Sequence, residues 1–139
     1  MRGRWAQRLG PVFGLTDFGA NVTTLEPGAW SSQRHWHTST DELVYVLSGE
    51  LVLVTDDGEE VLRAGAAAGF KADDPNGHHL QNRSGEDATF LEIGTRLASD
   101  SATYPDVDLL SPPHQQPAIY THWDGTPYPK RDRSGPATT

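Results

Sequence analysis

The chain has 139 residues, no cysteine and a formal net charge of −8 at pH 7. This length predicts a single domain with room for a hydrophobic core. The lack of cysteine excludes disulfides and thiolate metal sites. No run of about 18 apolar residues is present, so we expect no membrane span. The first ten residues hold no apolar stretch typical of a signal peptide, so we expect a cytoplasmic protein.

The negative charge is concentrated in the middle of the chain. Residues 12–128 hold eighteen acidic and five basic side chains, while three arginines lie in the first ten residues and three basic residues lie near the end. An acidic body repels the phosphate backbone of DNA and RNA, so we expect no nucleic-acid partner. We interpret the basic ends as solvated rather than as a binding patch.

Short segments with alternating apolar residues dominate the chain. The segments predicted as strands are, in chain order, 20–26, 43–47, 50–55, 59–63 and 88–94. Glycine-containing turns separate them, and Asp57-Gly58 is typical of a tight hairpin. No stretch of ten or more residues carries an apolar stripe with helical spacing. Closely spaced strands without helices predict an all-β sandwich or barrel.

The chain changes character after the last of these strands. Residues 99–117 are rich in proline and show little alternation, which is typical of an arm or lid. Residues 119–123 are predicted to return as a short edge strand. We therefore expect an irregular N-terminal arm over residues 1–14, a barrel over 15–98, and an irregular C-terminal arm and tail over 99–139.

The stretch "GAWSSQRHWHTSTDELVYVLSGEL", residues 28–51, holds two histidines two positions apart. In an extended strand, His35 and His37 point to the same face about 7 Å apart, with Gln33 on that face. A bend over residues 38–40 would bring Glu42 back beside them. Imidazole is the commonest metal ligand. A lone His-x-His pair also arises by chance on a polar strand, so this pair alone does not establish a site.

A second histidine pair supports the hypothesis of a metal site. The segment "AGAAAGFKADDPNGHHLQNRS", residues 64–84, places His78 and His79 next to a predicted strand. Adjacent residues of a strand face opposite ways, so only one of these histidines can point inward. Asn82, four positions after His78, is predicted to hold a neighbouring loop through side-chain hydrogen bonds.

These two segments resemble the two motifs of the cupin superfamily. The first reads Gly28, six residues, His35-Trp36-His37, four residues, Glu42, six residues and a glycine at position 49. The second reads Gly65, a turn over residues 73–77, His78 and Asn82. The resemblance covers roughly residues 15–96. More narrowly, the chain is similar to small single-domain bacterial cupins often labelled sugar-phosphate-isomerase-like.

The resemblance implies a jelly-roll β-barrel that holds one divalent transition metal. The implied ligands are His35, His37, Glu42 and His78, with His78 favoured over His79 by its spacing to Asn82. Three imidazoles and one carboxylate suit Fe²⁺, Mn²⁺, Ni²⁺, Co²⁺ or Zn²⁺, and the sequence does not choose among them. Members of this superfamily often form dimers, so we expect a homodimer.

Three further residues near the motifs have open roles. Gln33 is either an outward polar residue, or a further metal ligand or hydrogen-bond donor to substrate that makes a candidate catalytic pair with Glu42. Lys71 stands where relatives carry proline, and we favour a solvated residue over a cation aimed at an anionic ligand. Glu92 interrupts an apolar strand and either faces solvent or faces the interior. If it faces the interior, we favour a structural ion pair with Arg96 or Arg34 over a catalytic role.

We therefore expect a metal-dependent enzyme that acts on a small organic molecule. The chemistry at such a site is Lewis-acid or dioxygen chemistry, of the oxygenase, isomerase or lyase/cyclase type. The alternatives are a cupin that binds a small ligand without catalysis, and a metal-free isomerase that uses histidine and glutamate as acid and base.

Overall fold

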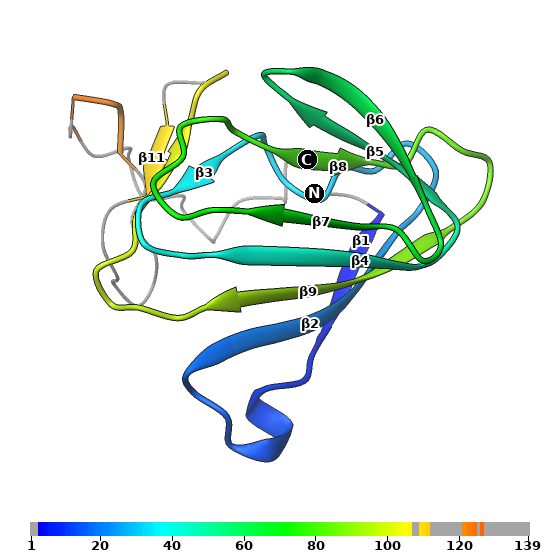
Figure 1. Ribbon diagram of the computed structural model, residues 1–139, viewed down its shortest axis with the longest axis horizontal. Coiled ribbons are helices and arrows are strands. Elements are labelled where there is room, and N and C mark those ends of the chain that lie inside the picture. The colour runs from blue at the N-terminus through cyan, green and yellow to red at the C-terminus, as the bar shows by residue number, and fades with distance from the viewer. Residues whose placement is uncertain (1–2, 107–108, 112–120, 125, 127–139) are drawn as a thin grey trace, which may run out of the picture.

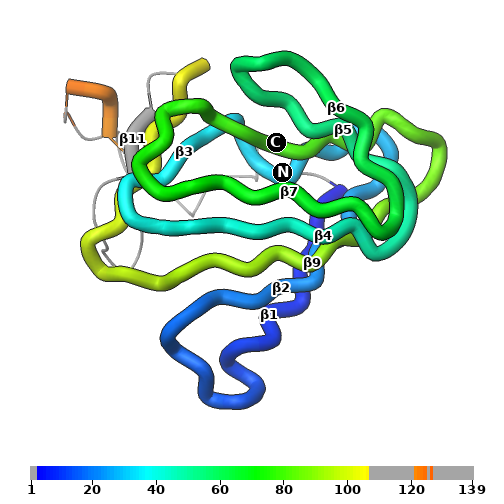
Figure 2. Tube along the Cα trace, viewed as in Figure 1, coloured from blue at the N-terminus to red at the C-terminus, as the bar shows by residue number. Residues whose placement is uncertain are grey.

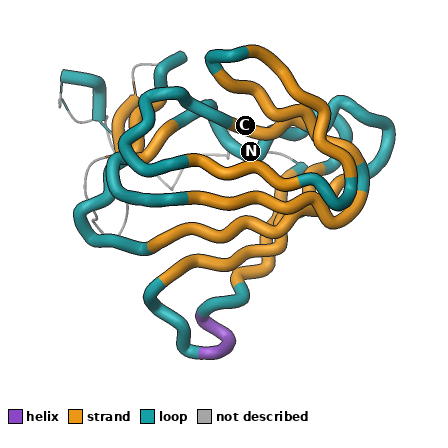
Figure 3. The backbone as a smooth tube through the Cα atoms, in the orientation of Figure 1, coloured by secondary structure: helices purple, strands orange, loops and turns teal. Residues whose placement is uncertain are grey.

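The computed structural model describes residues 3–106, 109–111, 121–124 and 126. Within them lie eleven strands and one 3₁₀ helix, η1 (Pro11–Phe13). The strands are β1 (Arg4–Arg8), β2 (Phe18–Leu25), β3 (Trp36–His37), β4 (Glu42–Ser48), β5 (Glu50–Thr55), β6 (Gly58–Arg63), β7 (Ala67–Phe70), β8 (His79–Gln81), β9 (Ala88–Thr95), β10 (Ala102–Tyr104) and β11 (Leu109–Ser111). Figure 3 shows this nearly pure strand content, with η1 as the one purple turn.

The strands form a five-stranded antiparallel sheet and two three-stranded sheets. The large sheet has the order β1-β2-β9-β4-β7, and the smaller sheets have the orders β6-β5-β8 and β11-β10-β3. Figure 1 shows the β6-β5-β8 sheet above the large one, with β3 and β11 at the left end. The tube in Figure 2 makes plain that β2 lies between β1 and β9, a neighbour about seventy residues later in the chain. This is the predicted all-β jelly-roll architecture.

The hydrophobic core lies between the large sheet and the β6-β5-β8 sheet. Fully buried apolar side chains come from both layers: Leu25, Val44, Val46 and Phe90 from the large sheet, and Leu51, Leu53, Leu62 and Leu80 from the smaller one. Burial of each such side chain contributes about 1.5–3 kcal/mol relative to an exposed one. Along the inner face of β9 the apolar Phe90 is followed by Glu92 and Gly94. The core therefore fills one end of the fold and leaves a polar end beside Glu92.

Glycine is required where β4 turns into β5. Gly49 has φ of 79°, and a Cβ at this position would lie 2.7 Å from the backbone oxygen of Asp87. Any side chain would therefore be strained in backbone conformation and would also collide with the start of β9. The predicted Asp57-Gly58 turn between β5 and β6 is confirmed, and Gly58 has φ of 117°.

All five strands predicted from alternation are present, as β2, β4, β5, β6 and β9. The prediction of an extended strand through His35 and His37 is wrong in its length, because only Trp36–His37 is a strand and residues 31–34 bend. The regular β1 corrects the expectation of an irregular N-terminal arm. Every residue of β1 is exposed, so its sequence has no alternation to detect.

The C-terminal arm contributes β10 and β11, which pair with each other, and β10 also pairs with β3. Of the edge strand predicted over 119–123, residues 119 and 120 lie outside the described part of the chain. The predicted boundaries at 14 and 98 stay predictions. No helix among the described residues has the length and apolar character needed to cross a membrane.

Candidate metal centre

Three histidines converge on one carboxylate at the polar end of the fold. Glu42 is the first residue of β4, and its Oε1 lies 2.7 Å from His37 Nε2 and 3.8 Å from His35 Nε2. Its Oε2 lies 3.3 Å from His78 Nε2. His35 and His78 are joined by two backbone hydrogen bonds, of 3.1 and 2.8 Å. The structure thus brings together the four residues that the resemblance implied as ligands.

The segment between His37 and Glu42 turns the chain back on itself as the sequence predicted. The Thr38 N–H donates to the Ser101 carbonyl oxygen at 2.9 Å, and the Thr40 hydroxyl donates to the Thr95 carbonyl oxygen at 3.3 Å. These bonds tie the turn to β9 and to the start of the C-terminal arm. They set Glu42 directly opposite Gly94, where the absence of a side chain leaves room for the carboxylate.

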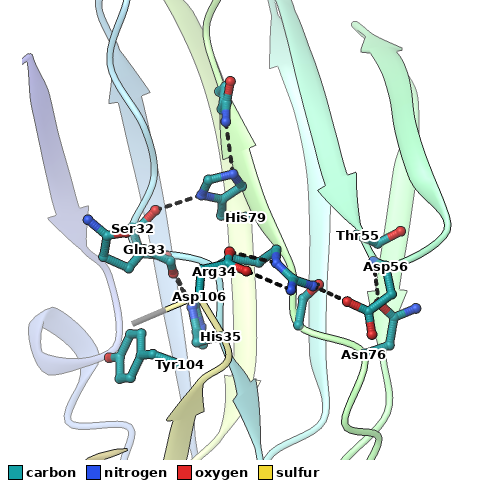
Figure 4. A network of polar contacts seen from close by, with 12 residues as sticks. Ser32, Gln33, Arg34, His35, Thr55, Asp56, Asn76, His79, Tyr104 and Asp106 are labelled. Atoms are coloured by element: carbon teal, nitrogen blue, oxygen red, sulfur yellow. Dashed lines mark hydrogen bonds and ion pairs between the residues drawn. The ribbon is translucent and has the colours of Figure 1, made fainter. Parts of the chain in front are cut away.

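The outer nitrogens of two histidines are held by acceptors. His37 Nδ1 donates to Asp100 Oδ2 at 2.7 Å, and His35 Nδ1 donates to the Gln33 carbonyl oxygen at 2.9 Å, as Figure 4 shows for His35. Because carbonyl and carboxylate oxygens only accept, both protons must lie on Nδ1. In its neutral form, each ring then presents the lone pair of Nε2 toward Glu42, which is how outer contacts orient metal-binding histidines.

His78 is held by packing instead. Its ring stacks on Phe70 with centroids 3.6 Å apart and planes 3° apart. Burial lowers the pKa of His78, although Glu42 opposes this shift, so the ring is neutral at pH 7. Neutral imidazole is the form that binds metal.

The carboxylate of Glu42 stays ionised in this site. Burial alone would raise its pKa, but the contacts with His35, His37 and His78 outweigh burial and lower it far below its ordinary value. Burial likewise opposes protonation of His37, but Glu42 and then Asp100 outweigh it and raise the His37 pKa.

The unpaired atoms of the cluster fit a bound cation. Glu42 Oε1 is buried without a hydrogen-bond partner, although His37 Nε2 lies only 2.7 Å away. With His37 in the neutral form that binds metal, two lone pairs at this distance repel each other, and a buried carboxylate oxygen without a partner is costly. The ligand atoms of His35, Glu42 and His78 lie within 4.8 Å of one another. A divalent ion among these atoms would satisfy all of them.

His79 turns away from this cluster. Its Nδ1 donates to the Ser32 carbonyl oxygen at 2.9 Å, and its ring meets Trp30 edge-on at 4.8 Å. Figure 4 shows the hydrogen bond between His79 and Ser32. The structure therefore places His78, and not His79, beside Glu42, as strand alternation and the spacing to Asn82 predicted.

Asn82 holds the loop after β8, as predicted. It is 1% exposed, and its amide donates to the carbonyl oxygens of Leu25 at 2.8 Å and Glu86 at 2.7 Å. Its Oδ1 accepts from the backbone N–H and the hydroxyl of Ser84. These bonds fix the end of β8 and so the position of His78.

Gln33 lies apart from the cluster. Its side chain is exposed and lines neither of the two cavities that meet at the cluster. The bend over residues 31–34 breaks the strand alternation that would have turned Gln33 inward. The geometry gives no support to its predicted role as a ligand or substrate donor, and its backbone carbonyl acts instead by orienting His35.

Two cavities meet at the cluster. The first has a volume of about 640 Å³ and the second about 470 Å³, and both are bordered by His37, Thr40 and Glu42. The first extends over Asn21 and Glu92 toward the outer strands of the large sheet. Val44, Val46 and Leu80 belong to the core and line neither cavity. The openings to the centre therefore lack these apolar side chains.

Glu92 faces the first cavity without an ion pair. The predicted pair with Arg96 or Arg34 is wrong within the described residues, because Arg34 binds Asp106 and Asp56 instead (Figure 4). The Thr23 hydroxyl lies 3.5 Å from Glu92 Oε2. Burial and then the nearby charge of Glu42 raise the pKa of Glu92. The structure places an acid with a raised pKa in the same cavity as the cluster.

Two other residues complete the comparison with the sequence. Lys71 is exposed and lies 3.2 Å from Asp41 Oδ1, which confirms the interpretation of a solvated residue. Asp100, which holds His37, was not recognised in the sequence. It lies in the proline-rich arm, and an isolated acid there carries no spacing signal.

Comparisons with known proteins agree with this architecture. The profile of the cupin domain matches residues 21–94. A sugar phosphate isomerase of the cupin superfamily from Silicibacter pomeroyi DSS-3 is 46% identical, with a TM-score of 0.89 over 93% of this chain and 82% of that chain. A candidate sugar phosphate isomerase from Acidithiobacillus ferrooxidans is 26% identical, with a TM-score of 0.81 over 92% of this chain and 81% of that chain.

A polyketide cyclase from Streptomyces resistomycificus resembles the chain in fold alone, at 21% identity and a TM-score of 0.59 over 68% of this chain and 66% of that chain. No curated protein sequence matches. The cupin profile spans more than half of the chain and covers most strands of the large sheet together with the histidine cluster. The chain belongs to the cupin family.

Proposed function

We propose that this protein is a metal-dependent cupin enzyme that acts on a small organic molecule. One divalent transition metal would be held by His35, His37, Glu42 and His78. The observation that carries the proposal is the buried Oε1 of Glu42, which has no hydrogen-bond partner although imidazole nitrogens surround it.

The reaction class that the site supports best is isomerisation. When bound, the metal would supply Lewis-acid polarisation of a substrate oxygen. The chain itself offers Glu92, half-buried in the first cavity with a raised pKa, as a group that can take and return a proton. The name of the Silicibacter pomeroyi protein, a sugar phosphate isomerase, favours the same class over an oxygenase or a lyase/cyclase.

The first test is the metal content of protein purified without chelator or affinity metal. Elemental mass spectrometry should find about one Fe, Mn, Ni, Co or Zn per chain, as a four-ligand centre requires. His78→Ala should lose this metal. His79→Ala, the matched control one residue away, should keep it because His79 contacts Ser32 and Trp30.

Metal retained in His78→Ala and lost in His79→Ala would contradict the assigned ligand set. A wild-type protein that takes up none of the five metals would contradict metal dependence altogether.

A metal-free acid–base isomerase is the second candidate, because Glu92 and His35 line one cavity. Chelator treatment separates the two. Activity on small phosphorylated or carboxylated sugars should disappear with chelator and return with metal under our proposal. It should be insensitive to chelator in the metal-free case, and absent throughout in a cupin that only binds a ligand.

We also propose that the chain forms a homodimer. The outer face of β4 exposes Leu43, Tyr45 and Leu47, which are 45%, 42% and 45% exposed. Three large apolar side chains on one sheet face favour contact with a second copy. Sedimentation equilibrium should give twice the chain mass, and Tyr45→Glu should shift the protein toward the monomer.

A further inference from the structure

Two arginines line the first cavity. Arg8 is the last residue of β1, and Arg96 directly follows β9. Resting on the proposed function, we infer that these two arginines form a subsite for the phosphate group of a small phosphorylated substrate, whose other end lies at the metal centre. We call Arg8 and Arg96 the arginine pair.

The arginine pair differs from most other cations of the chain. Among the described residues, four basic side chains have a carboxylate partner within 4.0 Å: Arg34, Arg63, Lys71 and Arg83. Within the same part of the chain, neither member of the arginine pair has one. Arg4 has none either, but it lines neither cavity. The same cavity is also lined by Glu92 and by Asp100, and Asp100 is hydrogen-bonded to His37. In a protein with nineteen acids against eleven bases, two cations without a carboxylate partner in one cavity still favour an anion as their ligand.

The sheet register directs the pair toward the metal centre. Arg8 lies opposite Asn21, and Asn21 lies opposite Glu92, so the three side chains form a row on one face of the large sheet. Arg96 lies two residues beyond Gly94 on that face, and its side chain passes over Gly19. Both arginines therefore border the polar part of the inner sheet face that leads to Glu42.

Two glycines keep this part of the sheet face free of side chains. Gly19 and Gly94 pair with each other, and Gly94 pairs with Glu42, so the row beside the carboxylate has no side chain on β2 or β9. Four neighbouring strands span about 14 Å from β4 to β1. The long arginine side chains shorten this distance, which leaves space for a chain of a few carbons. Asn21 and Glu92 lie between the two ends as hydrogen-bonding partners for hydroxyl groups.

The charge of the pair favours phosphate over a carboxylate. A phosphate monoester carries about −1.5 to −2 charges at pH 7, which two guanidinium groups neutralise. A single carboxylate would leave one of them uncompensated. Guanidinium groups also bind phosphate oxygens through paired, charge-assisted hydrogen bonds. Within the described residues, the second cavity offers a single cation, Lys71, which is already paired with Asp41.

The test measures the binding of inorganic phosphate by isothermal titration calorimetry. The ionic strength is held constant with chloride. It is run on protein stripped with chelator and on protein loaded with metal, because phosphate can also bind a metal directly. Arg8→Gln and Arg96→Gln should each weaken phosphate binding about ten-fold or more in both forms, as loss of a charge-assisted, paired contact predicts. The matched control is Arg83→Gln, an exposed arginine that lines neither cavity and pairs with Glu59. It should leave phosphate affinity unchanged.

Three outcomes would overturn the inference: no phosphate binding by the stripped wild type up to about 10 mM, equal binding by both variants and the wild type, or acetate binding as tight as phosphate. If either glutamine variant fails to fold, as judged by circular dichroism, the phosphate affinity of Arg8→Lys and Arg96→Lys is measured instead. They keep the charge but lose the paired geometry, so a smaller loss of affinity is expected. Failure of the metal proposal alone would appear as absent metal with arginine-dependent phosphate binding intact.

Discussion

The two cavities that meet at Glu42 differ in the charge of the side chains around them. Away from the shared cluster, the first cavity carries the arginine pair, supplied by the end of β1 and by the residue after β9, together with the carboxylates of Glu92 and Asp100. The second carries three carboxylates, Asp57, Glu60 and Asp74, together with Lys71. The excess of carboxylates repels an anion from the second cavity, whereas the first offers two arginines to it.

This difference follows from the segments that build each opening. The second is bordered by the acidic β5–β6 hairpin and by the loop between β7 and β8. Asp57 of the hairpin accepts a hydrogen bond of 3.0 Å from Asn76 of that loop. The first is bordered by the N-terminal strand, which contains no acidic residue. The asymmetry shows how a chain with a strongly negative total can still place two arginines in one cavity, because the local arrangement of charges and not their sum decides what a site attracts.

The largest effect should come from Glu42, since it borders both cavities. Glu42→Gln removes the charge on which His35, His37 and His78 converge, so metal affinity should fall by about 100-fold or more. Competition with a chromophoric chelator measures this. Glu60→Gln, which removes a carboxylate from the second cavity alone, is the matched control and should change metal affinity less than about two-fold. Equal losses in both variants would mean that the second cavity takes part in metal binding.

The next effect should come from Asp100, on the side of the first cavity. Its Oδ2 accepts from His37, and its Oδ1 accepts from the Ser39 N–H at 2.9 Å. Asp100→Ala frees the imidazole to rotate, so metal affinity should fall about 10- to 100-fold, the usual size for loss of such an outer contact. The matched control is Asp74→Ala, which removes an aspartate from the second cavity. Asp74 accepts a hydrogen bond from the Asn76 N–H there and does not contact the histidines. Unchanged affinity in Asp100→Ala would show that His37 is oriented by its strand alone.

The sequence was informative wherever a regular pattern carried the signal. Alternation located β2, β4, β5, β6 and β9. It is clearest in β4, which has one face in the core and one outside, whereas β5 buries Leu51, Val52 and Leu53 in succession. The resemblance of the two motifs to those of cupins implied the set His35, His37, Glu42 and His78, which the structure brings together. The rule that adjacent strand residues face opposite ways separated His78 from His79.

The remaining parts depend on long-range contacts that no local pattern encodes. The exposed β1 has no alternation, and Arg8 looked like a solvated terminal charge until the pairing of β1 with β2 placed it at a cavity. Asp100 meets His37 across sixty-three residues. The exposed position of Gln33 could not be read from the sequence, because the bend over residues 31–34 depends on tertiary bonds such as the one from the Ser31 N–H to the Leu80 carbonyl oxygen.

The smallest effect, and the one with a distinctive pH dependence, should come from Glu92 in the first cavity. Burial and then Glu42 raise its pKa in the folded protein above the ordinary value of 4.5. The folded state therefore holds the proton more tightly than the unfolded state does. The contribution of Glu92 to stability is fully present below pH 4.5 and is lost as the pH rises through the folded pKa. At pH 7 the wild type bears the cost of a half-buried charge next to another carboxylate.

Glu92→Gln removes this cost and keeps an acceptor near the Thr23 hydroxyl, so it should stabilise the metal-free protein at pH 7 by roughly 0.5–1 kcal/mol, a common size for one substitution. Urea denaturation at pH 4 and pH 7.5 measures this, and the gain should shrink at the lower pH. Glu59→Gln is the opposite control, because Arg83 lowers the pKa of Glu59, and its loss should not stabilise the protein at pH 7.5. A gain in stability that comes with a loss of activity in Glu92→Gln would show that the first cavity keeps this acid for its chemistry, since a charge that only weakened the fold could be replaced without loss. A variant that loses stability equally at both pH values would show instead that Glu92 is held by its contacts and that the cavity does not raise its pKa.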